Sequence, residues 1–321
     1  MTPTHLASIR SRLLSRQSSR ALPGVCDRRT FTVAAGAWLA GWPNGAHATS
    51  TRTRARLVEI EKSVRGRVGV FARQGTQTLL MHRERERFAM CSTFKAPLAG
   101  FVLDDIARGR LQADRLVSFE GLELVSYSPV LEAQRKAGLS GLSVLGLCHA
   151  AVTISDNTAA NLLLRLIGGP AGFTARAKKL DHSTRLDRNE PELNENRAGD
   201  PRDTTTPSGM AKLLHTMLFG SGIDPEAAAQ LRAMMIDCRT GSARLRAGLP
   251  KGPTVGDKTG TSGNGLFGDI AFVRSDAKEP IVIASYVDAP KATMAEGNQA
   301  HREIGELLAT VASATHGVQS R

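Results

Sequence analysis

The segment "MCSTFKAP", residues 90–97, decides how the rest of the chain is interpreted, because it places a serine three residues before a lysine. Ser92 and Lys95 lie on one face of a helix that starts near Ser92. An apolar stripe continues along the same helix through Phe94, Leu98, Val102 and Ile106. Burial of that stripe takes Lys95 out of water and lowers its pKa, so that a neutral amine can accept the serine proton. Ser92 acting only as a helix cap is the competing interpretation.

A second motif, "SDN" at residues 155–157, stands between the apolar run "LCHAAVTI" and the predicted helix "TAANLLLRLI". A hydroxyl and an amide two positions apart, in a break between helices, can point into one cleft. Ser155 would then pass a proton to a leaving group, and Asn157 would bind a substrate amide. Ordinary helix capping explains this tripeptide equally well when it is taken alone.

A third motif, "DKTGT" at residues 257–261, lies on a predicted strand that ends in glycines. Lys258 and Thr259 can bind a carboxylate, and Gly260 permits close approach of the backbone to a ligand. An edge strand that leads into a turn produces the same pattern.

A long charged loop runs from Arg185 to Thr205, with two prolines and little apolar periodicity. Long loops in compact domains are usually functional or disordered. Glu190 and Asn194 in this loop can hold a water between a carboxylate and an amide, and an ion pair between Arg188 and Asp203 would fix its two ends. The alternative is a solvated loop without a function.

The regular elements predict an α+β fold whose sheet is built from both ends of the chain. A helix from Leu57 is followed by a hairpin with its turn at Gly75, and its strands are predicted at residues 67–73 and 77–82. In the last part of the chain, strands are predicted at residues 254–261, 268–274 and 280–287, followed by a closing helix at residues 298–313.

The middle of the chain, from Ser92 to about Ile236, is predicted to be mostly helical. Capping residues before proline predict helix starts at Thr206-Pro207 and at Asp224-Pro225. The run Gly168-Gly169-Pro170 predicts a helix end.

The four motifs, in this order and at these separations, resemble those of class A serine β-lactamases, which belong to the penicillin-binding and serine β-lactamase superfamily. The resemblance covers roughly residues 57–312. It implies a five-stranded antiparallel sheet flanked by helices and set against an all-helical domain. We expect a catalytic domain at residues 49–321, with an α/β part at about 51–90 and 237–321 and an all-helical part at about 91–236.

The resemblance also implies a mechanism for hydrolysis of penicillins and cephalosporins, and hence resistance to them. Ser92 attacks the β-lactam carbonyl and becomes acylated, while the backbone N–H groups of Ser92 and Thr261 form the oxyanion hole. Either Lys95 or Glu190, acting through water, is the acylation base. Ser155 relays a proton to the lactam nitrogen, and Glu190 activates the water for deacylation.

The expected catalytic residues are therefore Ser92, Lys95, Ser155 and Glu190. Expected substrate-binding residues are Asn157, Asn194, Lys258, Thr259, Gly260, Thr261, Tyr127 and Arg244. Asn157 would hold the acylamido oxygen, Lys258, Thr259 and Thr261 the substrate carboxylate, and Tyr127 would line the rim of the cleft. Arg244 matches a position from which some family members supply a guanidinium to the same anion; an exposed arginine on a loop is the alternative. No metal and no cofactor are expected.

The first 48 residues differ in composition from the rest, with six arginines, one acid and a short apolar run that starts at Phe31. That run is too short to span a bilayer and is followed by "AHA" at residues 46–48, a cleavage signature. The pair Arg28-Arg29 resembles a twin-arginine export signal; an ordinary secretory signal is the alternative. We expect export to the periplasm or the medium, with no stable membrane anchor after processing.

Removal of this segment would lower the net charge from +12 to about +7. The remaining basic residues are scattered, so nucleic acid is not an expected partner. We expect β-lactams as the small-molecule partners and a monomeric protein, as is usual in the family.

Cys91, Cys148 and Cys238 remain after processing, an odd number, so at least one thiol is outside any intrachain disulfide. Some relatives bridge a cysteine before the nucleophile to one just beyond K-T-G-T, but Ser262 stands there. We therefore expect buried free thiols.

Two alternative functions share parts of the pattern. A D-alanyl-D-alanine peptidase has the same three short motifs but lacks the loop that carries Glu190 and Asn194. A non-catalytic β-lactam sensor would be acylated without turnover.

Overall fold

The computed structural model describes residues 45–197, 199–275 and 279–319. Its main sheet has five strands in the order β2-β1-β9-β8-β7, and every neighbouring pair is antiparallel. The strands are β1 (Arg67–Gln74), β2 (Gln77–His82), β7 (Thr254–Ser262), β8 (Leu266–Arg274) and β9 (Ile281–Asp288). Strand β1, from the first part of the chain, pairs with β9 near its end. The predicted sheet built from both chain ends is thereby confirmed.

Ten α-helices surround this sheet within the described residues. They are α1 (Gly45–Val64), α2 (Lys95–Ala107), α3 (Pro129–Lys136), α4 (Val144–His149), α5 (Asn157–Leu166), α6 (Gly169–Ala177), α7 (Pro207–Leu218), α8 (Pro225–Ile236), α9 (Leu245–Gly248) and α10 (Met294–Gln319). Short irregular helical turns are η1 (Cys91–Phe94), η2 (Ala150–Ile154) and η3 (Glu192–Asn194).

Capping side chains begin two of these helices where the sequence predicts them. The Thr206 hydroxyl accepts a hydrogen bond from the backbone N–H of Gly209 at the start of α7. The Asp224 carboxylate accepts one from Glu226 at the start of α8. Each cap satisfies an N–H group that has no partner inside its own helix, which fixes where the helix starts.

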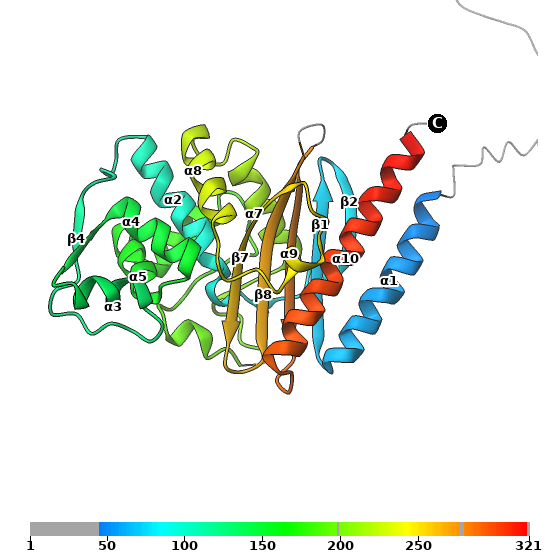
Figure 1. Cartoon of the computed structure of the whole chain (residues 1–321), viewed down its shortest axis with the longest axis horizontal. Coiled ribbons are helices and arrows are strands. Elements are labelled where there is room, and N and C mark those ends of the chain that lie inside the picture. Colours follow the sequence, from blue (N-terminus) through cyan, green and yellow to red (C-terminus); the bar gives the residue numbers. More distant parts are fainter. Residues whose placement is uncertain (1–44, 198, 276–278, 320–321) are drawn as a thin grey trace, which may run out of the picture. The chain divides into compact units, whose positions relative to one another are not determined.

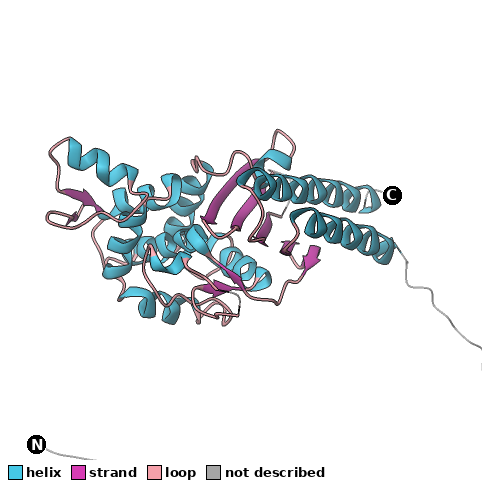
Figure 2. Cartoon of the chain, turned by 90° about the horizontal axis from the view of Figure 1, so that it is seen from below, coloured by secondary structure: helices cyan, strands magenta, loops and turns pink. Residues whose placement is uncertain are grey.

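The two faces of the sheet bury two separate hydrophobic clusters. Along β9, Ala284 and Tyr286 belong to the cluster shared with the helical part, whereas Ile283 and Val287 belong to the cluster shared with α1 and α10. This alternation follows from the two-residue period of a strand. Figures 1 and 2 show α1 and α10 side by side on one face of the sheet, where α9 also packs against α10, and the helices from the middle of the chain on the opposite face.

The part expected to be all-helical, at about 91–236, differs from the prediction in containing short strands. β4 (Leu116–Ser118) pairs with β5 (Gly141–Ser143), and β6 (Thr204–Thr205) pairs with β3 (Phe88–Ala89). Strands of two or three residues show no detectable alternation in the sequence, and their partners fix them. β3 and β6 connect the start of the serine segment to the end of the charged loop.

The predicted export signal at residues 1–48 lies largely outside the described residues, as does Cys26. Helix α1 begins at Gly45, so the cleavage signature at residues 46–48 falls within its first turn. No helix in the described part of the chain is long and apolar enough to cross a membrane.

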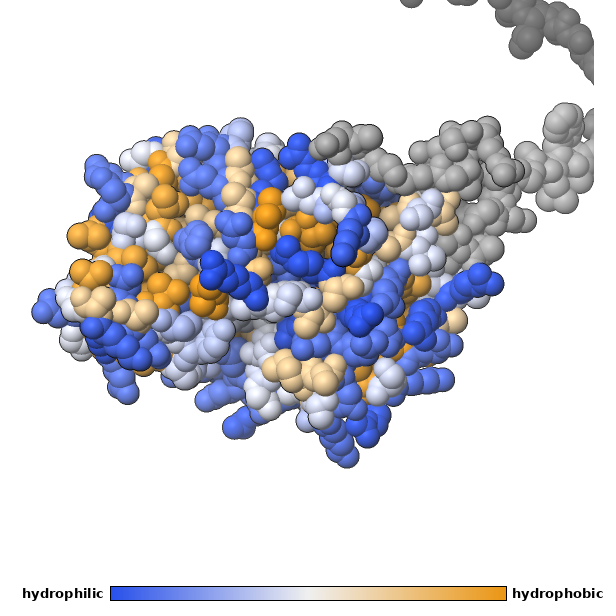
Figure 3. Space-filling model, in the orientation of Figure 1, coloured by the Kyte–Doolittle hydropathy of each residue, from blue (hydrophilic) through white to orange (hydrophobic). Residues whose placement is uncertain are grey.

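Large exposed hydrophobic side chains gather in the helical part, where Leu116, Leu139 and Leu145 are among them. In the view of Figure 3, hydrophobic surface is likewise more extensive over the helices on the left than over the region of α9 and α10. The layer formed by α1 and α10 has charged outer contacts, such as the ion pair between Arg56 and Glu303.

Candidate active site

Ser92 lies in η1, a single tight turn that precedes α2. Cys91 has a positive φ of 44°, and the Thr93 hydroxyl donates to the carbonyl of Met90 at 2.7 Å. The chain therefore enters the helix through a sharp turn that exposes the Ser92 hydroxyl. Lys95 opens α2 one turn later, and its Nζ donates to Ser92 Oγ at 2.9 Å. The pairing expected from the three-residue spacing is present.

The amine of Lys95 is fully buried and surrounded by acceptors. Besides Ser92, it donates to the carbonyl of Ser155 at 2.9 Å and to Oδ1 of Asn157, and it lies 3.0 Å from Glu190 Oε1. Burial lowers the pKa of Lys95, and the negative charge of Glu190 opposes part of that shift. Burial thus favours the neutral amine next to the serine hydroxyl, whereas the charge of Glu190 favours the ammonium form.

Glu190 is held from several sides, although it comes from an irregular loop. Its backbone N–H donates to Asn161 Oδ1 at 2.9 Å, and its carbonyl accepts from Asn161 Nδ2 at 2.8 Å. Asn194 Nδ2 donates to Glu190 Oε2 at 2.5 Å, which leaves Oε1 at 3.4 Å from Ser92 Oγ. Asn161 was missed from the sequence; its position four residues after Asn157, on the same face of α5, is a usable signal.

The two ends of the charged loop are pinned together by Asp203, which is fully buried. Its Oδ2 accepts from Arg188 Nε at 2.6 Å, and its Oδ1 accepts from the backbone N–H groups of Asp187 and Arg188. The loop also buries Leu186 and Leu193. The alternative of a solvated charged loop is therefore wrong.

The "SDN" segment follows η2, and Ser155 adopts a left-handed conformation with φ of 68°. Asp156 is the residue that caps α5, since it accepts from the backbone N–H of Ala159 at 2.8 Å. The same carboxylate also accepts from Val130 and Leu131 and so ties α3 to α5. Because Asp156 does the capping, Ser155 and Asn157 are free to face the cavity.

Strand β7 forms an edge of the main sheet and brings "DKTGT" against the serine turn. Lys258 Nζ donates to Ser155 Oγ at 3.0 Å, and burial lowers the pKa of Lys258 to about 8. The hydroxyl of Thr259 lies 2.5 Å from that of Thr240. A Cβ added to Gly260 would lie 2.7 Å from the carbonyl oxygen of Met90, so this glycine accommodates the serine turn itself.

Arg244 is buried, with only 4% of its surface exposed. Its guanidinium donates to the carbonyls of Gly260 and Gly268, both at 2.8 Å, to Thr261 Oγ1 at 2.6 Å and to Asn298 Oδ1 at 2.9 Å. Burial lowers the pKa of this group. The alternative of an exposed loop arginine is wrong, and the buried cation places positive charge beside Thr261.

These segments surround a cavity of about 440 Å³. Its lining residues are Ser92, Tyr127, Ser155, Asn157, Asn194, Thr240, Arg244, Thr259, Gly260, Thr261, Met294 and Asn298. Tyr127, which is 58% exposed, stands at the rim. Sequence reasoning missed Thr240, Met294 and Asn298, because no motif marks them. Lys95, Lys258 and Glu190 do not line the cavity but lie behind its wall, bonded to Ser92, Ser155 and Asn194. A hydroxyl with two buried amines and a buried carboxylate close by is a set of groups that can carry out acyl transfer.

The three described cysteines, Cys91, Cys148 and Cys238, are free and buried, as expected. Burial raises the pKa of the Cys91 thiol to about 12. This thiol therefore packs behind the serine turn in its neutral form. Within the described ranges, no group of three His, Cys, Asp or Glu side chains is arranged to hold a metal ion.

Comparisons with known proteins identify relatives of this chain. The model of the β-lactamase enzyme family matches residues 52–312. β-Lactamase AST-1 of Nocardia asteroides is 40% identical over 265 residues, which cover 82% of this chain and 82% of AST-1. β-Lactamase FAR-1 of Nocardia farcinica is 42% identical over 232 residues, which cover 72% of this chain and 73% of FAR-1.

Solved structures show the same similarity in three dimensions. An ancestral class A β-lactamase reconstructed for Gram-negative bacteria superposes with a TM-score of 0.77 at 44% identity and covers 80% of this chain and 99% of its own. A β-lactamase from Xanthomonas campestris gives a TM-score of 0.78 at 37% identity and covers 82% of this chain and 98% of its own.

Proposed function

The chain belongs to the class A β-lactamase family, and from this membership we propose that it hydrolyses penicillins and cephalosporins through an acyl-enzyme at Ser92. The observation that carries the proposal is the contact set around Ser92 Oγ, with Lys95 Nζ at 2.9 Å and Glu190 Oε1 at 3.4 Å. Hydrolysis of the β-lactam ring before the drug reaches its target confers resistance.

In the acylation step, Ser92 Oγ attacks the lactam carbonyl and gives up its proton. Lys95 is the nearer acceptor, and its lowered pKa favours direct transfer to the amine; Glu190 acting through water is the alternative route. When the C–N bond breaks, Ser155 passes a proton to the lactam nitrogen. The contact of Lys258 Nζ with Ser155 Oγ at 3.0 Å supports this relay, because a cation there favours proton release by the hydroxyl.

The substrate carboxylate would bind at the end of β7. Lys258, Thr259 and Thr261 supply an amine and two hydroxyls there, and Arg244 adds a second cation through its contact with Thr261. Backbone N–H groups of Ser92 and Thr261 would hold the carbonyl oxygen as it becomes negative. The close packing of Gly260 on the serine turn supports this assignment, because it brings the two segments together.

Deacylation depends on Glu190. Asn194 fixes one carboxylate oxygen and Asn161 fixes the backbone, so the other oxygen is directed toward Ser92. A water held between Glu190 and Asn194 would attack the ester, with Glu190 as the general base. We propose that this loop distinguishes the protein from a D-alanyl-D-alanine peptidase, in which the acyl-enzyme would persist.

The first test is turnover of nitrocefin by the purified protein. Ser92→Ala should abolish hydrolysis and also prevent the mass increase that acylation produces, because no nucleophile remains. A Ser92→Ala protein that keeps measurable turnover would disprove the role of Ser92.

The second test is Glu190→Ala, for which we expect normal acylation and a deacylation rate lower by about 10² to 10⁴-fold. Intact-mass spectrometry after mixing with a penicillin should then show a persistent acyl-enzyme. Glu192→Ala is the matched control, because Glu192 is exposed in the same loop. Rapid return of the Glu190→Ala protein to its free mass would refute the assignment.

We also propose that residues 1–48 direct export, and that Arg28-Arg29 is recognised by the twin-arginine system. The composition of this segment supports the proposal. Cell fractionation after replacing both arginines by lysine tests it, because retention of the precursor inside the cell is expected.

A further inference from the structure

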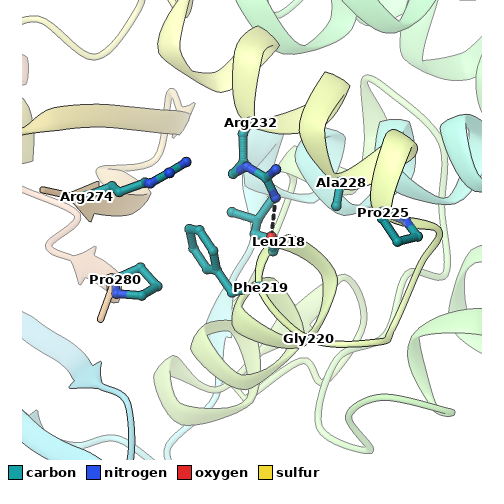
Figure 4. A pocket seen from close by; sticks show the side chains of 8 residues that line it. All are labelled: Leu218, Phe219, Gly220, Pro225, Ala228, Arg232, Arg274 and Pro280. Atoms are coloured by element: carbon teal, nitrogen blue, oxygen red, sulfur yellow. Dashed lines mark hydrogen bonds between the residues drawn. The ribbon is translucent and has the colours of Figure 1, made fainter. Parts of the chain in front are cut away.

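A second cavity, of about 290 Å³, lies outside the catalytic site. It is bordered by the end of α7, one face of α8, the end of β8 and the start of β9 (Figure 4). Its volume is at the lower end of the range for small-molecule sites. None of the residues that carry the proposed reaction lines it.

Two arginines dominate one side of this cavity. Figure 4 shows the side chain of Arg274 of β8 extending toward Arg232 of α8, whose guanidinium turns toward the carbonyl of Leu218, with the ring of Phe219 nearby. The guanidinium of Arg232 lies 5.6 Å from the centre of that ring and donates to the carbonyl of Leu218. Burial lowers the pKa of Arg232, and the nearby positive charge of Arg274 contributes to the shift.

This pair of positive charges has no ion-pair partner in the part of the chain that the structure describes. Neither guanidinium forms an ion pair with a described carboxylate, and Asp276 lies outside the described residues. Two like charges that face one space repel each other, and an anion placed between them would remove that cost. The arrangement therefore favours a negatively charged occupant.

The remaining wall of the cavity is apolar and contains a flat aromatic surface. Phe219 offers its ring, and Pro225, Ala228 and Pro280 supply the other apolar contacts. The ring is held in place by an edge-to-face contact with Phe272, with ring centres 5.6 Å apart. A ligand that fits must join a flat apolar body to an anionic group.

We propose that this cavity binds a small aromatic carboxylate or sulfonate, whose anionic group bridges Arg232 and Arg274 while its ring packs on Phe219. Bidentate contact with guanidinium groups suits both acid types. The proposal does not depend on the proposed function, because its test measures binding without any β-lactam.

The test uses naphthalene-2-sulfonate as the probe and its uncharged analogue naphthalene-2-sulfonamide as the comparison. Calorimetric titration of the purified protein should show saturable one-to-one binding of the sulfonate and at least about tenfold weaker binding of the sulfonamide. Amide NMR should locate the sulfonate through shifts at Gly220 and Ala228. The absence of saturable binding at millimolar concentration, or equal binding of the two probes, would overturn the proposal.

Variants identify the residues. Arg274→Gln and Arg232→Gln should each weaken sulfonate binding by about tenfold or more, since each removes one charged hydrogen-bond donor group. Arg165→Gln is the control, because Arg165 is an exposed arginine on α5. If the Arg232→Gln protein does not fold, the binding affinity of the Arg274→Gln protein tests the proposal by itself. The side chain of Arg274 is exposed at the end of β8, so its replacement should leave the fold intact.

Unchanged affinity in the Arg274→Gln protein would refute the bridging role. Shifts confined to Thr259 and Gly260 would place the probe in the catalytic cavity, and this outcome would equally refute the proposal.

Discussion

Gly260 stands where strand β7 passes closest to the serine turn. The position that a Cβ would take lies 2.7 Å from Met90 O and 2.9 Å from Ser92 N, both of which are backbone atoms. Backbone cannot move aside as a flexible side chain can, so any larger residue must push the strand and the turn apart. Since both segments would supply an N–H group to the oxyanion, this distance matters to catalysis.

We therefore expect Gly260→Ala to lower kcat for nitrocefin by about 10² to 10³-fold, as loss of one oxyanion donor does. Gly263→Ala is the control, because its Cβ would meet nothing within 4 Å. Circular dichroism should show both proteins folded. Equal kcat in the two variants would mean that the turn tolerates the displacement.

At the scale of elements, the charged loop behaves as a defined structure because its ends are fixed. The carboxylate of Asp203 binds Arg188 and two backbone N–H groups, and β6 continues directly from it to pair with β3. Glu190 lies between these fixed ends and is additionally clamped by Asn161. The position of the proposed general base thus depends on contacts made by β3, β6 and α5.

Arg188→Met should destabilise the protein by about 3 kcal/mol, because it leaves the carboxylate of Asp203 buried without its cation. It should also prolong the acyl-enzyme, since the loop that carries Glu190 loses its anchor. Arg202→Met is the control: its guanidinium is half exposed in the ion pair with Asp200, so its loss should lower the stability much less than the loss of Arg188. Urea unfolding measures the free energy of unfolding, and mass spectrometry measures the lifetime of the acyl-enzyme. Similar values of these two quantities in the Arg188→Met and Arg202→Met proteins would argue against an anchoring role for Arg188.

At the scale of the whole molecule, the sheet separates two hydrophobic clusters, and α1 and α10 cover one of them. Glu61 links α1 to the first hairpin, since its carboxylate accepts from the backbone N–H of Val68, from the guanidinium of Arg83 and from His82. Burial raises the pKa of this carboxyl, but the hydrogen bonds outweigh burial and hold it at about 2.

A folded-state pKa below the ordinary value of 4.5 means that Glu61 stabilises the fold above that pH. Its contribution should disappear as the pH falls from about 4.5 to about 2. The Glu61→Gln protein should therefore be less stable than the parent protein at neutral pH, and this difference in the free energy of unfolding should vanish as the pH approaches about 2. Urea unfolding at a series of pH values measures it. Glu59→Gln, on an exposed part of the same helix, is the control variant.

The sequence by itself determined the fold class, the family and the identity of the proposed catalytic groups. Its signals are local, because Ser92 and Lys95 share one helical turn, Thr206 and Asp224 cap helices next to them in the chain, and strand alternation shows within single segments. The order of the motifs then identified the family, which supplied the layout of the sheet.

Tertiary structure alone decided how those groups are held. The burial of Arg244, the clamp of Asn161 on Glu190 and the packing of Gly260 on the serine turn all join residues that are far apart in the chain. The short strands β3 to β6 likewise exist only through their partners. The hydrogen bonds, burial and pKa of a side chain depend on its neighbours in space, whereas a motif specifies only which residues are neighbours along the chain.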